Sequence, residues 1–283
     1  MWPITAINRA LDRQARARRD KYLFIICMNN SGSTLLERIV SECRNGVGFP
    51  APAGPEQQVN GQGFVPDLMP IPGKMTPKCR RIWSEQAAVF EDESRYKWRR
   101  IKRRWLRQWS RNPKFETADP RIFLEKSPPD VFRTAMLQKH FRNSFFILMQ
   151  RNPYAVAEGI RRRAKLPIER CTQHWIRCAQ KQIENEQSLH HQISLSYEQL
   201  SEEPDYCRRK IVEFIPEFDD VDVRKDVAVH SIDGYVRQPI TNYNAKQIDL
   251  LSEEDLSAIN QRLDQVPEVM AHFGYDYIRS KRS

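Results

Sequence analysis

The run Tyr22-Leu-Phe-Ile-Ile-Cys-Met28 leads through a polar turn, Asn29-Asn30-Ser31-Gly32-Ser33, into Thr34-Leu-Leu-Glu-Arg-Ile-Val-Ser-Glu42. The first piece is continuously apolar and rich in aromatic and β-branched residues, which is typical of a strand buried on both faces. In the third piece the leucines, Ile39 and Val40 recur at helical spacing. A buried strand, a tight turn and a helix in this order predict the opening of an α/β nucleotide-binding fold.

The turn itself has the composition of an anion-binding site. Its small residues allow several backbone N–H groups to gather at the helix N-terminus, where the hydroxyls of Ser31, Ser33 and Thr34 add further donors. The common ATP and GTP version of such a loop, G-x-x-x-x-G-K-[ST], contains a lysine that reaches the phosphates. This turn is shorter and has no lysine. It therefore predicts a phosphate or sulfate site of a different type.

A second buried strand is predicted by Ser144-Phe-Phe-Ile-Leu-Met149, which is followed by Gln150, Arg151, Asn152 and Pro153. Asn152 is a favourable N-cap and Pro153 a favourable first helical residue, so a helix should begin directly after the strand. Arg151 should then stand at the carboxyl end of a parallel strand. Ligands bind at that edge in open α/β sheets.

The remaining signals complete one α/β domain over residues 1–283, with a core of about 21–277. We predict a P-loop-type three-layer fold, with a central parallel sheet flanked by helices and an inserted basic helical region. Further strands are expected at residues 121–124 and 193–197, and further helices at 83–109, 131–141, 170–189 and 252–273.

Residues 49–114 form the predicted insertion, an inserted loop and a basic helix. Residues 49–77 contain seven prolines and four glycines, which excludes long regular elements there. Arg95 to Lys114 contains ten lysines and arginines and no acid, and it accounts for the formal charge of +10 of the 283-residue chain. We expect the acceptor side of the site in this insertion.

The tryptophans of the basic helix leave three interpretations open. The helix can bury Trp98, Trp105 and Trp109 on the sheet and expose its charge, which is the common arrangement and the one we favour. It can instead bind nucleic acid by stacking bases on the indoles, although no nucleic-acid motif accompanies it and we do not expect that partner. In the third interpretation, Arg95–Lys114 gathers an anionic acceptor or surface.

Three more stretches give the chain a resemblance to a known family. Glu125-Lys126-Ser127-Pro128, Arg151-Asn152-Pro153 and Ser196-Tyr197-Glu198-Gln-Leu200 follow the turn in the order found in sulfotransferases that use 3'-phosphoadenosine 5'-phosphosulfate (PAPS). With a closing segment at residues 251–275, the resemblance covers most of residues 21–277. The chain looks most similar to the bacterial and tyrosylprotein-type branch of that family.

The resemblance implies residue roles. The nucleotide co-substrate PAPS would be bound by Asn30, Ser31, Gly32, Ser33, Thr34, Leu35, Arg151 and Tyr197. Lys126 would be the catalytic cation at the sulfuryl group, and Glu56, in Gly54-Pro55-Glu56-Gln57, the catalytic base. No metal is expected. The chain departs from the family pattern at Asn30, where Lys or Arg is usual, and at Gly159, where Ser is usual.

These observations predict in-line transfer of a sulfuryl group from PAPS to a hydroxyl acceptor, which we expect to be a carbohydrate, a lipid or another small molecule. One alternative is a P-loop nucleotide kinase or NTPase, which the missing lysine argues against. Another is a PAPS- or PAP-binding protein with weakened catalysis, suggested by Asn30.

The expected location is the cytoplasm. The first residues of the chain contain no apolar run of signal-peptide length, and the longest apolar runs are too short to span a bilayer. The six cysteines are irregularly spaced and are expected to be reduced thiols.

Overall fold

A five-stranded sheet forms the centre of the computed structural model, which describes residues 19–50, 79–231 and 234–280. The strands lie in the order β2-β3-β1-β4-β5, and every neighbouring pair is parallel. Their bounds are β1 Lys21–Cys27, β2 Gly46–Val47, β3 Ile122–Glu125, β4 Ser144–Gln150 and β5 Gln192–Ser196. The predicted parallel α/β fold is therefore confirmed.

The register of the sheet brings the carboxyl ends of three strands together. Cys27 at the end of β1 pairs with Met149 of β4, and Phe24 pairs with Glu125 at the end of β3. The residues that follow these strands are the turn after β1, Lys126 and Arg151. The three segments with the sequence features of a ligand site thus meet at one edge of the sheet.

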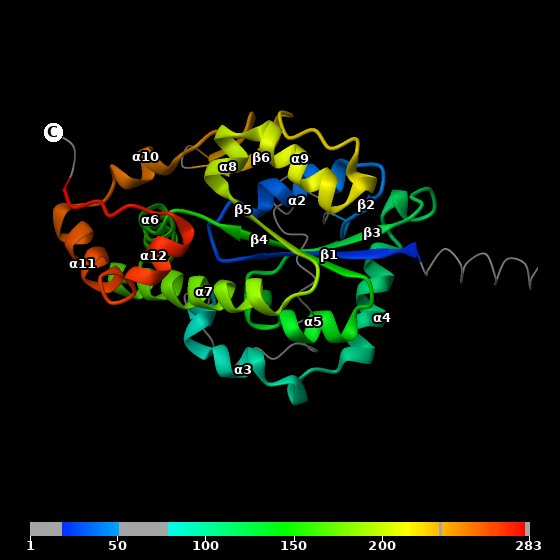
Figure 1. The fold of residues 1–283 in the computed structure, drawn as a ribbon, viewed down its shortest axis with the longest axis horizontal. Helices are drawn as coiled ribbons and strands as arrows, with labels where there is room; N and C mark the ends of the chain where they lie inside the picture. The colour runs from blue at the N-terminus through cyan, green and yellow to red at the C-terminus, as the bar shows by residue number, and fades with distance from the viewer. Residues whose placement is uncertain (1–18, 51–78, 232–233, 281–283) are drawn as a thin grey trace, which may run out of the picture.

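Helices cover both faces of the sheet, as Figure 1 shows. One face carries α2 (Ser33–Glu42), α8 (Tyr197–Glu202) and α9 (Pro204–Phe214). The other carries α4 (Trp98–Trp109), α5 (Thr134–His140) and α7 (Ile168–Ser188). Along β1, Leu23 and Ile25 belong to the first core, while Phe24 and Ile26 belong to the second. This alternation explains why the strand is continuously apolar.

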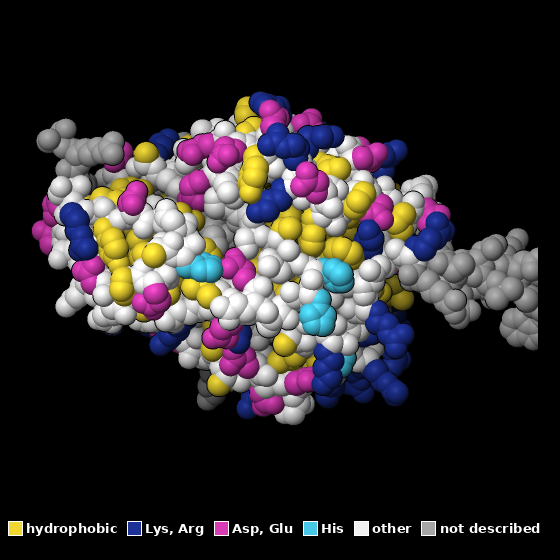
Figure 2. All heavy atoms as spheres, in the orientation of Figure 1, with side chains coloured by type: hydrophobic (Ala, Val, Ile, Leu, Met, Phe, Trp, Pro, Cys, Tyr) yellow, Lys and Arg dark blue, Asp and Glu magenta, His cyan; other side chains and the backbone are white. Residues whose placement is uncertain are grey.

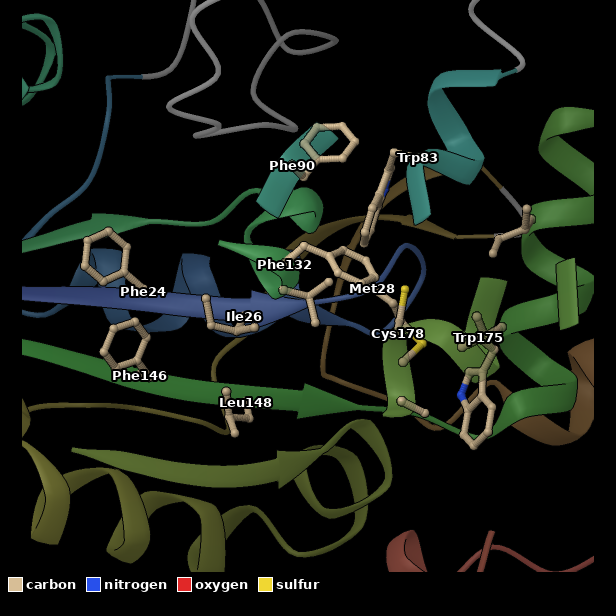
Figure 3. Close-up of a cluster of buried hydrophobic side chains, with 14 of the residues drawn as sticks. Phe24, Ile26, Met28, Trp83, Phe90, Phe132, Phe146, Leu148, Trp175 and Cys178 are labelled. Atoms are coloured by element: carbon tan, nitrogen blue, oxygen red, sulfur yellow. The ribbon is translucent and has the colours of Figure 1, made fainter. Parts of the chain in front are cut away.

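The second core is the larger one, and Figure 3 shows part of it. Phe24, Ile26 and Met28 of the β1 segment face Phe146 on β4 and Trp83 from the insertion. Burial of these aromatic and aliphatic side chains fixes the position of the strand end from which the turn starts.

Residues 79–109 form four short helices, so the prediction of one helix over 83–109 was wrong. They are the 3-10 helices η1 (Cys79–Gln86) and η2 (Glu93–Arg95) and the α-helices α3 (Ala87–Glu91) and α4. Asp92 is extended, and its side chain accepts a hydrogen bond from the backbone of Ser94 at 3.1 Å, which starts a new helical turn. Tyr96 is also extended, and its buried hydroxyl donates to the carbonyl of Phe90 at 2.8 Å. Capping and burial thus override helical periodicity here.

The α4 tryptophans lie in the core. Trp98, Trp105 and Trp109 are 7%, 0% and 1% exposed. Trp105 stacks on Phe141 with ring centroids 5.4 Å apart, and the indole N–H of Trp109 donates to the carbonyl of Leu124 at 3.0 Å. The helix therefore buries its tryptophan face, and these indoles do not present rings for stacking nucleic-acid bases.

The C-terminal part adds elements that sequence patterns did not indicate fully. β6 (Val227–Ser231) and β7 (Gly234–Gln238) form an antiparallel pair that was not predicted. The predicted helix over 252–273 is divided into α11 (Glu253–Leu263) and α12 (Pro267–Phe273), because Pro267 cannot continue a helix and begins a new one. Two further helices are α6 (Pro153–Ala164) and α10 (Asn244–Ile248). In the described ranges, no helix combines the length and the hydrophobicity that crossing a membrane requires.

We predict that Trp105→Ala lowers the free energy of unfolding by about 3–5 kcal/mol, because it removes a fully buried indole and leaves a cavity. Urea denaturation measures this loss. Leu106→Ala is the matched control on the same helix, since Leu106 is 47% exposed and its loss should stay within about 0.5 kcal/mol. Equal losses in the two variants would contradict the assignment of the tryptophan face to the core.

Candidate active site

The turn between β1 and α2 adopts the backbone conformation of an anion-binding nest. Asn30 and Gly32 have φ of 62° and 81°, both in the left-handed region. The hydroxyl of Ser31 donates to the carbonyl of Met28 at 2.9 Å, which closes the turn on the end of β1. The first N–H groups of a helix lack intrahelical acceptors, and a turn of this kind directs them to a common centre. This turn is the segment that the sequence predicts as the anion site.

Gly32 is needed at this turn because Tyr197 lies against it. A Cβ atom built on Gly32 would lie only 2.5 Å from Cδ2 of Tyr197. Tyr197 is 3% exposed and begins α8; its hydroxyl donates to the carbonyl of Thr241 at 2.6 Å and accepts from the backbone N–H of Tyr243 at 3.1 Å. The ring of Tyr197, which the resemblance assigns to nucleotide binding, thus packs against Gly32 and supports the turn.

Arg151 connects the turn to α10. Its guanidinium donates to the carbonyl of Asn30 and to Oδ1 of Asn244, both at 2.9 Å, and to Oε1 of Gln247. It also lies over the ring of Tyr197, with Cζ 3.9 Å from the centroid. The residue is 6% exposed, and burial lowers the pKa of its guanidinium, against the charges of neighbouring groups such as Tyr197.

A guanidinium has five N–H groups. Arg151 gives one of them to the turn and two to α10, which leaves two for a ligand. Its position at a strand end before an N-capped helix matches the sequence prediction. The side chain of Asn152 accepts from the backbone of Tyr154 at 3.0 Å and of Ala155 at 3.3 Å, as an N-cap does.

The two departures from the family pattern are in contact with each other. Gly159 lies on α6 and faces Asn30: a Cβ at position 159 would be 3.2 Å from Nδ2 of Asn30 and 3.3 Å from Nε2 of Gln247. The space that a serine side chain would occupy is therefore bordered closely by two amide groups. A larger residue at position 159 would therefore displace the amide of Asn30 or that of Gln247.

Lys126 reaches the same turn from β3. It is 2% exposed, and its Nζ lies 3.2 Å from Oγ1 of Thr34 and 3.5 Å from Oε2 of Glu37. Burial raises the pKa of the Glu37 carboxyl, and Lys126 acts in the opposite direction. The predicted catalytic lysine and the predicted anion site are therefore adjacent.

The segment around Lys126 is held by a buried polar cluster. Glu125 accepts a hydrogen bond from the hydroxyl of Ser127 at 2.7 Å, and Arg133 forms an ion pair with Asp130. Burial, and then the charge of Asp130, raises the pKa of Glu125 well above its usual range. A network of this kind restricts the backbone that carries Lys126.

Sequence reasoning missed four residues of this site. Glu37 lies one helical turn after Thr34, and an acid at that spacing from the predicted site was a usable signal. Asn244 and Gln247 come from a helix far along the chain. Glu198 accepts from the backbone N–H of Asn152 at 2.9 Å. Glu198 stands in a stretch that carries the resemblance, but only the three-dimensional fold shows its contact and those of Asn244 and Gln247.

The structure describes all but one of the predicted site residues and brings most of them together. The turn residues, Lys126, Arg151 and Tyr197 are linked by the contacts above, and Leu35 packs on the core beneath α2. Glu56 lies outside the described residues. Among the residues that the structure describes, no group of His, Cys, Asp and Glu side chains is arranged to hold a metal ion.

Comparisons with known proteins agree on one family. The model of the sulfotransferase family matches residues 23–220. A search of curated proteins found no match.

Among solved structures, the sulfotransferase domain from the curacin biosynthetic pathway is similar with a TM-score of 0.51 and 18% identity, over 92% of this chain and 99% of that chain. The sulfotransferase domain from the Synechococcus PCC 7002 olefin synthase is similar with a TM-score of 0.53 and 17% identity, over 91% of this chain and 95% of that chain. At these identities the structures show a shared fold. The family match extends over well more than half of the sequence and includes the turn, Lys126 and Arg151, and the chain belongs to the sulfotransferase family.

Proposed function

We propose that this sulfotransferase transfers the sulfuryl group of PAPS to a hydroxyl acceptor that is a carbohydrate, a lipid or another small molecule. The observation that carries the proposal is the position of Lys126, whose Nζ lies 3.2 Å from the Thr34 hydroxyl at the start of α2. A buried cation beside a nest of N–H groups is the arrangement that a phosphosulfate requires.

The reaction divides between these groups. The turn N–H groups bind the 5'-phosphate, which is the leaving group, and Lys126 stabilises charge on the transferring sulfuryl. The bond between sulfur and the bridging oxygen breaks as the acceptor oxygen bonds to sulfur, as in phosphoryl transfer. The acceptor loses its proton to a base, for which Glu56 stays the predicted residue. The products are a sulfate ester and 3'-phosphoadenosine 5'-phosphate (PAP).

The 3'-phosphate is assigned to Arg151 and the Asn30 amide. Arg151 has N–H groups beyond those it gives to the protein, and Asn30 borders the space above Gly159. A charge-assisted hydrogen bond to phosphate contributes about 1.5–3 kcal/mol.

We predict that PAP raises the melting temperature of the protein, and that adenosine 5'-phosphate, which lacks the 3'-phosphate, raises it less. A ligand that binds only the folded state stabilises it by about 2.7 kcal/mol at a hundred times its Kd. Thermal-shift titrations with PAP, adenosine 5'-phosphate and ATP compare the rise in melting temperature that each ligand causes. Stabilisation by ATP alone would favour a nucleotide kinase. If the protein bound PAP but did not convert PAPS to PAP in the presence of acceptors, it would be a binding protein.

We predict that Glu37→Gln lowers turnover about 10- to 100-fold while PAP affinity changes little, because Lys126 loses one of its two anchors and its position shifts. Because burial raises the Glu37 pKa, the wild type should also lose turnover as the pH falls through that raised value and the carboxyl is protonated. The variant has no such carboxyl, so its turnover should not show this decrease at low pH (the acid limb of the pH profile). Initial rates of PAP release as a function of pH test both statements.

Glu42→Gln is the matched control for Glu37→Gln. Glu42 lies on the same helix and pairs with Lys225 at 2.5 Å, but the two side chains are 45% and 47% exposed. An exposed pair of this kind contributes little, so turnover and its pH dependence should not change. Wild-type turnover and an unchanged acid limb in Glu37→Gln would show that Glu37 does not position Lys126.

We predict that Gly32→Ala abolishes PAP binding and destabilises the fold, because its Cβ would overlap Tyr197 at a φ of +81°. Gly274→Ala is the control, since Gly274 has a φ of +68° but nothing within 4 Å of a Cβ. It should lose only about 1–2 kcal/mol of backbone strain and keep PAP affinity. Urea denaturation and PAP titration separate the two effects, and normal PAP binding by Gly32→Ala would contradict the role of the turn.

A further inference from the structure

The exposed side of α4 carries a dense group of cations. The cationic face consists of four arginines of α4 (Arg99, Arg100, Arg103 and Arg107) and of Arg111, just after the helix; all five are exposed. Figure 2 shows dark blue side chains gathered at the lower right, where Figure 1 places α4. Across the described ranges none of these five forms an ion pair, and the chain has no acid between residues 96 and 115. The cationic face is therefore positively charged, and no acidic side chain of the same segment neutralises it.

The cationic face is distant from the candidate active site. Trp109, on the opposite side of the same helix, packs against Tyr22 and Phe123, with ring centroids 5.9 Å and 4.7 Å apart. Tyr22 lies at the start of β1, and the anion-binding turn follows the other end of that strand. At about 3.3 Å per residue, the strand separates the two by roughly 20 Å. The arginines of this face therefore do not serve the phosphates of a nucleotide at the turn.

The structure also restricts what these cations can bind. The indoles of α4 are buried, so the face offers charge but no aromatic rings for stacking bases. Its exposed large apolar side chain is Leu106, which is 47% exposed and lies among the arginines in sequence. A helix of 12 residues presents this surface along about 18 Å. This surface matches the surface of an anionic lipid layer. The arginines can pair with phosphate head groups, and the apolar side chain can reach toward the hydrocarbon beneath them.

We propose that the cationic face of α4 binds the surface of an anionic lipid bilayer and thereby holds the enzyme at a membrane without spanning it. Electrostatic attraction to anionic head groups contributes about a factor of five in affinity for each Lys or Arg near the surface. Leu106 would enter the head-group layer between the arginines. This inference goes beyond the proposed sulfuryl transfer and does not depend on it, because the two surfaces are separate.

Vesicle flotation of the full chain tests the proposal. The wild type should bind vesicles of phosphatidylcholine that contain phosphatidylglycerol and should not bind pure phosphatidylcholine vesicles. The triple variant Arg100→Gln, Arg103→Gln, Arg107→Gln should bind the anionic vesicles about 100-fold more weakly, at a factor of about five per cation. Its urea denaturation midpoint should equal that of the wild type, which shows that the variant is folded.

A second triple variant with the same formal charge is the control. Arg44→Gln, Arg224→Gln, Arg279→Gln removes three exposed arginines that pair with Asp219, Asp205 and Asp264 at 2.6, 2.6 and 2.9 Å. It should retain vesicle binding. Equal loss in the two triple variants would overturn the proposal, since net charge and not the cationic face would then account for binding. The proposal would also be overturned if the wild type did not float with anionic vesicles. If the wild type then bound single-stranded DNA and the first triple variant did not, the cationic face would be a nucleic-acid site.

Discussion

The site depends on one buried cation, Arg151, more than on any other side chain. Its guanidinium holds the carbonyl of Asn30 at 2.9 Å and so fixes a residue in the left-handed region at the centre of the turn. The same group lies on the ring of Tyr197, which in turn leaves room only for glycine at position 32. A buried arginine is costly unless its N–H groups find acceptors, and Asn244 and Gln247 each accept a hydrogen bond from one of them. The phosphate turn is therefore shaped by contacts from outside the turn.

Two buried cations border the turn from different strands. Arg151 follows β4 and donates to the carbonyl of Asn30 at 2.9 Å. Lys126 follows β3, and its Nζ lies 3.5 Å from the Glu37 carboxylate. The side chain of Asn30 itself is a neutral amide, which forms hydrogen bonds without adding formal charge. An arginine or lysine at position 30 would place a third cation beside the turn.

Much of the fold was predictable because the central strands are buried on both faces and so are continuous apolar runs in the sequence. β1 and β4 were identified in this way, and the N-cap at Asn152 located the start of α6. β2 has two residues, which is too short for any periodicity. The breaks between residues 83 and 109 arise from the Asp92 cap and from burial of Tyr96, and the second of these depends on tertiary contacts.

The candidate site was predictable where the local sequence alone places a residue at the end of a strand. The turn, Lys126 and Arg151 each follow a strand, so the parallel sheet alone brings them to one edge. Asn244, Gln247 and Glu198 could not be found, because their role depends on where distant helices pack. Tyr197 was predicted as a strand residue or a ligand, and the structure makes it the first residue of α8 and the support of Gly32.

The contribution of α10 has a consequence for how the protein is made. All strands of the central sheet precede residue 197 and are therefore synthesised before α10. Asn244 and Gln247 leave the ribosome later, and until then Arg151 lacks two of its acceptors. The support that Arg151 gives to the turn is therefore complete only once α10 has been made and has packed, later than the synthesis of all five strands.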